Sequence, residues 1–454
     1  MSVSKTPEND VDAVSNQLDR IELNESTEDK NNNPLGNSNL SDVGKSREGE
    51  GDDDFVNFNA LWETLERVFQ QPCKSISRID QKTSNQIPYL VVMEDDSKYV
   101  VRISYPHPEN QFHNYSESYA VKRLECEANL TSYVASCTNI PVPNVYYWNA
   151  KKNNDVGSEF VIMEYLRGIP LRDEWSDLSF EEKQEVLLQI IDILLTLKEL
   201  EFPMIGSLYT IKDCEKSKMT IGECVFHVFM QSGRDETEDA QFGPFLSTRE
   251  FLQAALGKEL GFLESLDDEC HQLWSPIQMQ LIELFFKHFE SKDHDLTFVI
   301  CPSEISASKI LLDRDLDGNI KISGFLAWDC TGTKPLECLY KYPLWIKNNV
   351  ENATHSKERK AENIKLQDFF AQELFECDPD AKKICGDIMR NHFITAILEE
   401  YMRPWSIHKR IQLMYDKLNE GESEESKECT KDRNEDHTMK NYASESEENG
   451  KKNV

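Results

Sequence analysis

The sequence predicts an α+β protein with two lobes between two acidic tails. Three observations indicate this: strand-like segments crowd into one short region, a helix-rich region follows it, and both chain ends lack apolar periodicity. A small mixed lobe followed by a large helical one is a bilobal layout with a cleft between the lobes. The predicted units are a disordered tail at 1–54, an N-terminal lobe at 55–165, a helical C-terminal lobe at 166–419 and a disordered tail at 420–454.

The N-terminal lobe is predicted to begin with a helix and to continue as strands. FNALWETLERVF, from Phe58, places its apolar residues on one helical face. KSISRI, IPYLVVM and KYVVRI follow as strands, the last after a turn at Glu94–Lys98. A helix is expected from about Ser118 to Ser136, and then strands in NIPVPNVYYWN and EFVIMEYL. After Gly168 helices dominate, except in one hairpin.

Composition limits the classes of partner. The 454 residues carry a formal net charge of −32, of which −9 lies in residues 1–54 and −5 in residues 420–454. Such an acidic surface repels nucleic acid and anionic membranes, which require concentrated Lys and Arg. We therefore expect neither as a partner, and an unidentified protein or small-molecule ligand instead.

The location is predicted from the first residues, the apolar runs and the cysteines. MSVSKTPENDVDAVSNQLDR lacks the apolar core of a signal peptide and carries acidic residues that a transit peptide avoids. The most apolar run, VLLQIIDILLTL from Val186, is interrupted by polar residues at helical intervals, so it is a core helix. Twelve cysteines without a CxxC pair are typical of reduced thiols. A cytoplasmic and also nuclear location is expected.

One stretch, CPSEISASKILLDRDLDGNIKISGFLAWD at residues 301–329, has three alternative interpretations: a calcium loop, the remains of a catalytic loop, or a plain hairpin. Asp313, Asp315 and Asp317, with a glycine after them, match the first positions of a calcium-binding loop. Position 12 of such a loop must be a bidentate Glu, but it is Gly324 here, and the flanking segments favour strands. The calcium alternative is therefore disfavoured, since the turn of a hairpin accounts for these aspartates.

Several segments in register resemble the aminoglycoside phosphotransferase family, particularly its fungal branch. They are NIPVPNVYYWNAKKNNDVGSEFVIMEYLRGIPL from Asn139, PMIGSLY from Pro203 and QFGPFLSTREFL from Gln241. Their order and spacing agree over roughly residues 60–350. The resemblance implies the protein-kinase-like fold that this family shares with choline kinase.

The resemblance also implies nucleotide-binding roles in the N-terminal lobe, with ATP as the candidate cofactor. Arg102 falls where the family keeps a basic residue that contacts nucleotide phosphates, and Glu127 falls where a helix carboxylate orients that base. The connector, whose backbone would hold the adenine edge, comprises Met163, Glu164 and Tyr165. The alternative is an ordinary strand Arg, an exposed helix Glu and a buried strand. The expected phosphate loop, QKTSNQ, contains no glycine, so the usual backbone grip on a triphosphate is not predicted.

Residues 301–329 are where the resemblance implies catalysis. The family has His-x-Asp there, then four residues and an Asn, and a second Asp after the hairpin. The first Asp acts on the substrate hydroxyl, while the Asn and the second Asp hold magnesium. In this chain the four positions are Pro302, Glu304, Lys309 and Ala327. Ala327 removes a magnesium ligand and Lys309 puts an ammonium where the metal should bind, so no metal site is predicted.

The sequence therefore predicts a catalytically inactive relative, a pseudokinase that acts as a binding or regulatory protein. The alternative is an active or rewired ATP-dependent small-molecule phosphotransferase that uses Glu304 as its base and recruits Asp313 or Asp329 for a metal. If the second strand of the hairpin continues, Asp329 shares a strand face with Ala327 but lies about 6–7 Å further along. Asp329 would then be a poor substitute for the missing ligand.

Overall fold

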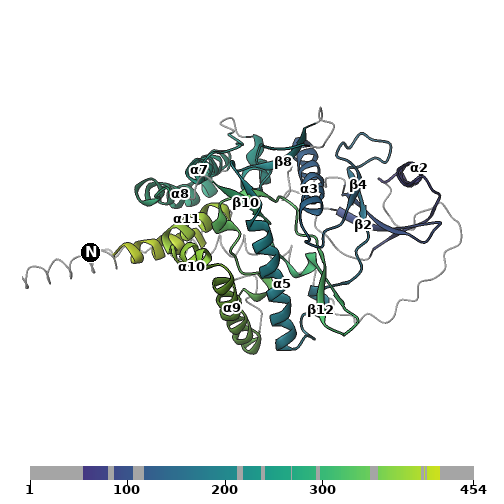
Figure 1. The fold of residues 1–454 in the computed structure, drawn as a ribbon. Coiled ribbons are helices and arrows are strands. Elements are labelled where there is room, and N and C mark those ends of the chain that lie inside the picture. Colours follow the sequence, from purple (N-terminus) through teal and green to yellow (C-terminus); the bar gives the residue numbers. More distant parts are fainter. Residues whose placement is uncertain are drawn as a thin grey trace, which may run out of the picture.

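The computed structural model describes most of the chain between the predicted tails. The described residues are 55–79, 86–105, 117–211, 218–236, 241–266, 268–292, 297–347, 356–399, 403 and 406–419. The two predicted tails, and most of the predicted phosphate loop QKTSNQ, lie outside these ranges. Figure 1 shows a sheet lobe at one side and a larger group of helices at the other. The predicted α+β fold with a sheet lobe and a helical lobe is thereby confirmed.

An antiparallel five-stranded sheet forms the N-terminal lobe. Its strand order is β1-β2-β3-β5-β4. The bounds are α2 Phe58–Phe69, β1 Cys73–Arg78, β2 Gln86–Met93, β3 Lys98–Ser104, β4 Val145–Asn149 and β5 Phe160–Glu164. Successive residues of a strand face opposite sides of a sheet. Val101 and Ile103 are fully buried in one apolar cluster with Leu61 and Leu65 of α2, so Arg102 between them faces the other side.

Helix α3 (Glu117–Cys137) joins the two lobes. It stands between the sheet and the other helices in Figure 1. On the sheet side, Leu124 packs in an apolar cluster with residues of β5. On the other side, the helix contacts a two-stranded sheet made of β8 (Ser207–Ile211) and β9 (Lys218–Gly222). Side chains of α3 are therefore within reach of both lobes.

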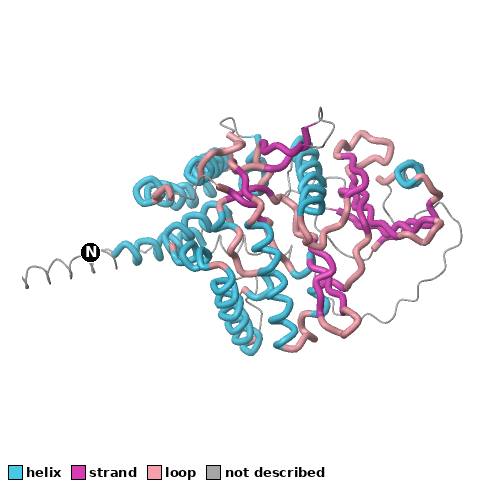
Figure 2. Tube along the Cα trace, in the orientation of Figure 1, coloured by secondary structure: helices cyan, strands magenta, loops and turns pink. Residues whose placement is uncertain are grey.

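Helices make up most of the C-terminal lobe, as Figure 2 shows. The α-helices are α4 Leu171–Glu174, α5 Phe180–Lys198, α6 His227–Met230, α7 Thr248–Glu264, α8 Asp268–His288, α9 Lys357–Cys377, α10 Pro379–Gly386 and α11 Ile388–Leu398. The 3-10 helices are η2 Gln231–Glu236, η4 Ala307–Lys309, η5 Leu336–Cys338 and η6 Leu344–Ile346. A capping box between Ser179 and Glu182 starts α5. Within the described ranges, no helix combines the length and the apolar character that a membrane span requires.

The C-terminal lobe contains more strands than the sequence predicted. The additional strands are β6 Ile169–Pro170, β7 Glu201–Phe202, β8, β9, β10 Phe298–Cys301 and β13 Gly332–Lys334. β8 and β9 were missed because SLYTI and KMTIG are short and mixed in polarity. Their position is fixed by packing on α3 rather than by an alternating pattern of their own.

The predicted hairpin consists of β11 (Ile310–Arg314) and β12 (Ile320–Phe325). The side chain of Gln189 on α5 makes two hydrogen bonds with the edge of β12. Its side-chain amide donates to the Ile320 carbonyl over 3.0 Å, and its side-chain carbonyl accepts the N–H of Ile322 over 2.8 Å. These bonds satisfy backbone groups that an edge strand would leave exposed, and they hold the hairpin against the core.

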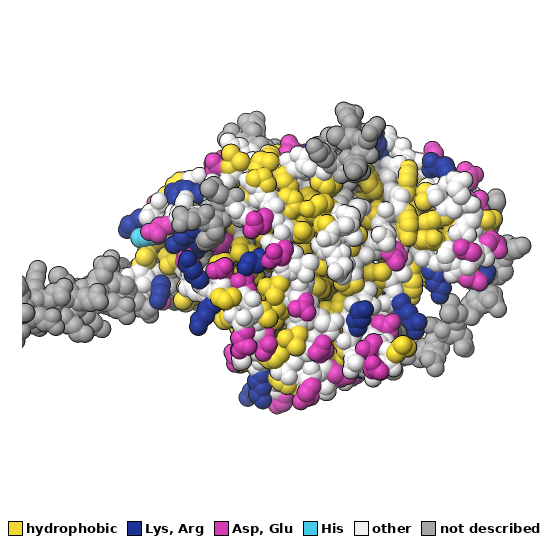
Figure 3. Space-filling view, viewed as in Figure 1, with side chains coloured by type: hydrophobic (Ala, Val, Ile, Leu, Met, Phe, Trp, Pro, Cys, Tyr) yellow, Lys and Arg dark blue, Asp and Glu magenta, His cyan; other side chains and the backbone are white. Residues whose placement is uncertain are grey.

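Charges of both signs are mixed on the surface in view. On the described part of the face in Figure 3, Lys and Arg side chains are interspersed with Asp and Glu and do not gather into one basic patch. Protein surfaces that bind nucleic acid usually show such a patch. This face therefore offers no basic patch of that kind among its described residues.

Candidate ligand site between the lobes

The structure brings the predicted Arg102 and Glu127 together. Nη2 of Arg102 on β3 forms an ion pair with Oε1 of Glu127 on α3. Glu127 is only 7% exposed, so the alternative of an exposed helix Glu is wrong, whereas the Arg102 side chain is 22% exposed. Nε of Arg102 has no hydrogen-bond acceptor among the described residues. The guanidinium therefore has a donor to spare, and its contact with a phosphate stays a prediction.

The predicted adenine connector is partly engaged within the sheet. Met163 is buried, and Glu164 binds the segment before β4: its N–H donates to the Asn144 carbonyl over 2.8 Å, and its carboxylate accepts from Asn144 Nδ2 over 2.7 Å. Tyr165 is 36% exposed, and Lys98 Nζ lies 5.8 Å from the centre of its ring. Recognition of an adenine by these residues stays a prediction.

The loop after β10 carries three of the four predicted catalytic positions. Pro302 is buried, Glu304 is exposed and Lys309 is half-buried. The Lys309 carbonyl accepts the N–H of Leu326 over 2.8 Å, so the loop lies against the segment that leads to Ala327. Among the described residues, no carboxylate oxygen lies within 4.0 Å of the Lys309 ammonium.

Ala327 and Asp329 do not share a strand face, which corrects the prediction. β12 ends at Phe325, and Asp329 lies in a turn. Ala327 is 1% exposed and belongs to the apolar core. Asp329 turns towards α3, where its Oδ2 lies 3.3 Å from Nη1 of Arg123. The extrapolation along the strand failed because the chain leaves the sheet before it reaches these residues.

Several cations act on Asp329. Burial raises the pKa of its carboxyl, but Arg123 and then Lys309 outweigh burial, so that the pKa lies well below its usual range. For the Arg123 guanidinium, burial lowers the pKa. The Asp329 carboxylate outweighs burial, so this pKa lies above its usual range. The pair is therefore fully charged at neutral pH.

His227, the first residue of α6, lies near the same charges. Burial lowers the pKa of its imidazole to about 4, against the opposing effect of Asp329. The cations that add to the effect of burial are Arg123, Lys334 and Lys309. The imidazole is therefore neutral at neutral pH, and it does not add to the positive charge around it.

Cys330 joins this group to α3. Its Sγ lies 3.1 Å from the hydroxyl of Tyr119 and 3.8 Å from Nδ1 of His227. Its backbone has φ +49°, in the left-handed region that side chains rarely adopt, directly after Asp329. Burial raises the pKa of the thiol, so it stays protonated and is not a nucleophile.

Lys334, at the end of β13, approaches the group from the other side. Its ammonium donates to Ser303 Oγ over 3.1 Å and lies 4.4 Å from the centre of the Phe226 ring. Burial lowers the pKa of this ammonium. In the described ranges, no carboxylate oxygen is found within 4.0 Å of it. The inter-lobe cluster, as we call it, comprises Arg102, Arg123, Glu127, His227, Lys309, Asp329 and Lys334.

Sequence reasoning missed three members of this cluster, and it named Asp329 only as a candidate metal ligand. Of the three, Arg123 left a usable signal, because it lies four residues before Glu127 and so shares its helical face. His227 and Lys334 have no sequence signal that predicts their place in the cluster, since only the tertiary fold brings them close to the other members.

The inter-lobe cluster does not fit magnesium. Ala327 has no ligand atom, Lys309 brings a positive charge, and Asp329 is already paired with a guanidinium. Mg²⁺ requires near-octahedral oxygen ligands. In the part of the chain that the structure describes, no three His, Cys, Asp or Glu side chains are close enough together to hold a metal ion. The available donors are N–H groups, which suit an anion.

The aspartates of the hairpin are used by its own turn. Asp315 Oδ1 accepts the backbone N–H groups of Asp317 and Asn319, each over 2.9 Å. Gly318 has φ +86°, a conformation that favours glycine. Both flanking segments are strands, so the hairpin interpretation is confirmed. The carboxylate of Asp315, which the calcium alternative needs as a ligand, accepts hydrogen bonds within the turn.

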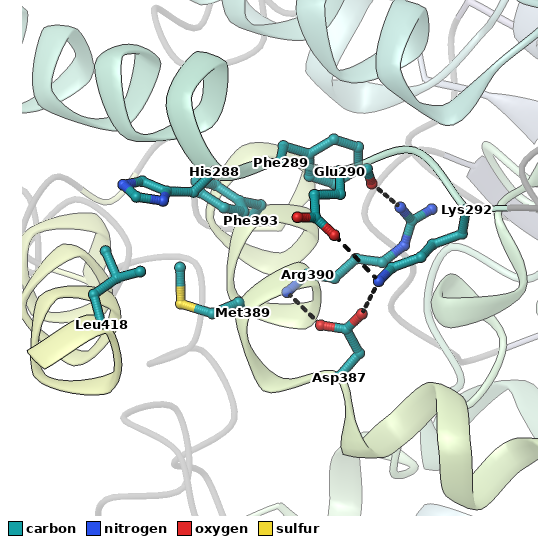
Figure 4. Close-up of a pocket in the computed structure, with 9 residues that line it drawn as sticks. All are labelled: His288, Phe289, Glu290, Lys292, Asp387, Met389, Arg390, Phe393 and Leu418. Carbon is teal, nitrogen blue, oxygen red and sulfur yellow. Dashed lines mark hydrogen bonds and ion pairs between the residues drawn. The ribbon is translucent and has the colours of Figure 1, made fainter. Parts of the chain in front are cut away.

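A pocket of about 260 Å³ lies elsewhere, among helices of the C-terminal lobe (Figure 4). Phe289, Met389 and Phe393 contribute apolar surface to it. Its charged groups are paired with one another: Lys292 Nζ lies 3.4 Å from Asp387 and 3.8 Å from Glu290. Unlike the inter-lobe cluster, this pocket offers a ligand no surplus of charge.

A family model matches part of the chain. Residues 75–275 match the family model APH, described as the phosphotransferase enzyme family. The resemblance to the aminoglycoside phosphotransferase family is thereby confirmed.

The curated relatives are fungal and longer. A subtelomeric hrmA-associated cluster protein of Aspergillus fumigatus is 25% identical over 201 residues, which cover 42% of this chain and 37% of that protein. The protein named altered inheritance of mitochondria protein 9, mitochondrial, of Yarrowia lipolytica is 28% identical over 139 residues, 29% of this chain and 23% of that one. The chain thus spans well under half the length of these relatives.

Solved structures that match most of the chain include aminoglycoside phosphotransferases. A putative aminoglycoside phosphotransferase of Ralstonia eutropha is 12% identical with a TM-score of 0.42, and the match covers 79% of this chain and 96% of that one. A thermostable mutant of aminoglycoside phosphotransferase APH(4)-Ia, solved with ADP and hygromycin B, is 11% identical with a TM-score of 0.42, covering 78% and 97%.

Proposed function

We propose that this chain is a phosphotransferase-like protein that does not transfer phosphate and instead binds a ligand between its lobes, as a binding or regulatory protein. One observation carries the proposal. Lys309 and Ala327 stand where the resemblance implies magnesium ligands, while Asp329 is held by Arg123. Phosphoryl transfer depends on metal ions that align the phosphates and neutralise their charge. Without those ligands the reaction loses its main source of electrostatic stabilisation.

The alternative, an active or rewired phosphotransferase, is favoured by Glu304. This carboxylate is exposed on the loop where the family keeps its base. The metal would still need ligands, and the candidates are engaged: Asp313 Oδ2 lies 3.6 Å from Arg167 on the surface, and a metal at Asp329 would have to displace Arg123. We therefore propose the non-catalytic function first.

The test is ADP formation from ATP in the presence of Mg²⁺ or Mn²⁺, with the wild type and Glu304→Ala compared. We expect equal rates in both, at the level of the buffer, because no metal is held against the phosphates. ADP formation that requires the metal and disappears in Glu304→Ala would overturn the proposal and establish the alternative.

A gain-of-function variant sharpens this test. Lys309→Asn combined with Ala327→Asp restores the two implied ligand types. We expect the melting temperature of the double variant with ATP to rise when Mg²⁺ is added. In the wild type, adding Mg²⁺ to ATP should give no further rise, since a ligand stabilises only the state that binds it. If the wild type already shows a magnesium-dependent shift, its own residues hold the metal and the proposal fails.

We further propose a cytoplasmic, and also nuclear, location. The cysteines whose side chains the structure describes are free thiols, which suits a reducing compartment. The names of some relatives contain the word mitochondrial. A fluorescent fusion of the full chain that coincides with a mitochondrial marker would overturn the proposed location.

A further inference from the structure

We propose that the inter-lobe cluster binds the polyphosphate group of a small molecule without a divalent cation, and that Lys309 and Lys334 supply the positive charge that a metal would otherwise bring. The proposal rests on the proposed function, because it requires a site that binds and does not transfer. It differs from metal-assisted nucleotide binding in the effect of Mg²⁺ on affinity. Here Mg²⁺ competes with the protein for the anion and weakens its binding, whereas a metal-assisted site needs Mg²⁺ to bind it.

The charge balance of the cluster calls for an anion. Its two arginines are each paired with a carboxylate. Lys309 and Lys334 have no such partner within 4.0 Å among the described residues. The cluster thus has two cations in excess, in a chain whose formal net charge is −32. Uncompensated, partly buried cations destabilise a fold, and a bound dianion would relieve that cost.

The two lysines converge although they come from different elements. The Lys309 carbonyl is hydrogen-bonded to Leu326, three residues before Asp329. The Lys334 ammonium binds the hydroxyl of Ser303, which itself donates to the carbonyl of Cys330. The backbone of Lys309 and the ammonium of Lys334 are therefore both anchored on the segment around Asp329.

The donors select the class of anion. Two ammonium groups and a spare Arg102 N–H favour a ligand with several negatively charged oxygens close together, as a phosphoanhydride has and a single carboxylate does not. A magnesium complex of the same ligand has its charge largely neutralised, and its metal would be repelled by the two ammonium groups. The metal-free anion should therefore bind better than its magnesium complex.

Calorimetric titration of the full chain with ATP and with pyrophosphate, each in EDTA and in excess Mg²⁺, tests this. We expect binding in EDTA that is weakened about 10-fold or more by Mg²⁺, and by Lys309→Met or Lys334→Met, because each variant removes a charged hydrogen-bond donor. Lys292→Met is the matched control: it removes a lysine from the distant pocket and should leave the affinity unchanged. Binding of pyrophosphate as tight as that of ATP would identify a bare polyphosphate site, and tighter ATP binding a nucleotide site.

Three results would overturn the proposal: binding that requires Mg²⁺, unchanged affinity in both lysine variants, or no binding of either probe at millimolar concentration. Melting curves check that the variants fold, and if Lys334→Met does not, Lys309→Met decides alone. ADP formation is measured in the same samples. ADP formation would overturn the proposed function. If neither ADP formation nor binding is observed, the binding inference is wrong and the proposed absence of phosphate transfer still holds.

Discussion

The inter-lobe cluster and the buried ion pairs of the helical lobe use the same residue types in different proportions. In the helical lobe, Arg234 is completely buried and its guanidinium lies 2.8 Å from Glu259. Arg390 forms a similar buried pair with Glu337. Both guanidinium groups also donate to backbone carbonyls. There, each cation has its own carboxylate, whereas the inter-lobe cluster has two lysines in excess.

The difference separates charges that support the fold from charges that await a ligand. A buried ion pair with matched charges has no charge left over, and losing one partner leaves a costly unpaired charge. A cation-rich group gains nothing from its surplus cations until an anion arrives. Removing a cation should therefore have opposite consequences in the two regions: lost stability in one and lost binding in the other.

The largest effect is expected from Arg234→Met. It leaves the buried Glu259 carboxylate without its cation, and burial already raises the pKa of that carboxyl despite the guanidinium. We expect the free energy of unfolding to fall by about 3–5 kcal/mol, as for other broken buried pairs. Urea unfolding of the two proteins measures the loss.

Two further variants control this prediction. Arg234→Met combined with Glu259→Leu removes both charges and should recover much of the loss, because no buried charge is left unpaired. Lys309→Met should lower the free energy of unfolding by no more than about 0.5 kcal/mol, because it removes a half-buried ammonium that has no carboxylate partner among the described residues. A loss at Lys309 as large as that at Arg234 would erase the difference between the two regions.

A smaller effect, visible only as a pH dependence, is expected from His227. Its folded-state pKa of about 4 lies below the ordinary 6.5, so the unfolded chain binds the proton more readily between these values. Stability should therefore rise from pH 4 to 6.5 and be complete above 6.5. His227→Gln should remove up to roughly 3 kcal/mol of this rise. The charged and titratable groups around the imidazole are unchanged in the variant; they are Asp329, Arg123, Lys334, Lys309 and Cys330.

Unfolding free energies of both proteins at pH 4, 5, 6 and 7 measure the difference. Carboxylates also titrate in this range, so only the difference between wild type and variant is informative. Parallel pH profiles would mean that folding does not lower the pKa of the imidazole, and the cluster would then gain a cation below about pH 6.5.

Much of the N-terminal lobe could be predicted because its pattern is local. KYVVRI read as a strand from its own residues, whereas the pairing of Arg102 with Glu127 was implied by the family resemblance, and the structure brings the two side chains together. The hairpin turn followed from Asp-Gly chemistry. β8 and β9 could not be predicted, since their partner is a helix far away in sequence.

Beyond Arg102 and Glu127, the sequence predicted mainly what the site lacks. Lys309 and Ala327 were identified from the motif that they interrupt, and the structure adds what surrounds them. The contact between Arg123 and Asp329 joins residues 206 positions apart, so no local pattern encodes it. The interpretation of Asp329 failed at one step, the assumption that β12 continues beyond Phe325. Once the chain leaves the strand, strand alternation no longer determines where the following side chains point.

The smallest effect is expected from Lys122, the neighbour of Arg123 on α3. Its Nζ lies 2.7 Å from Glu223 Oε2, but the two side chains are 34% and 47% exposed, against 10% and 23% for Arg123 and Asp329. Water and salt screen an exposed pair, so Lys122→Ala should lower the free energy of unfolding by at most about 1 kcal/mol, and about 0.5 M NaCl should remove most of that difference. Urea unfolding at low and high salt measures both. A loss comparable with that of Arg234→Met, or one that salt does not reduce, would show that α3 depends on its ion pairs irrespective of burial. The difference between paired and surplus cations would then have to be explained by their geometry rather than by their solvent exposure.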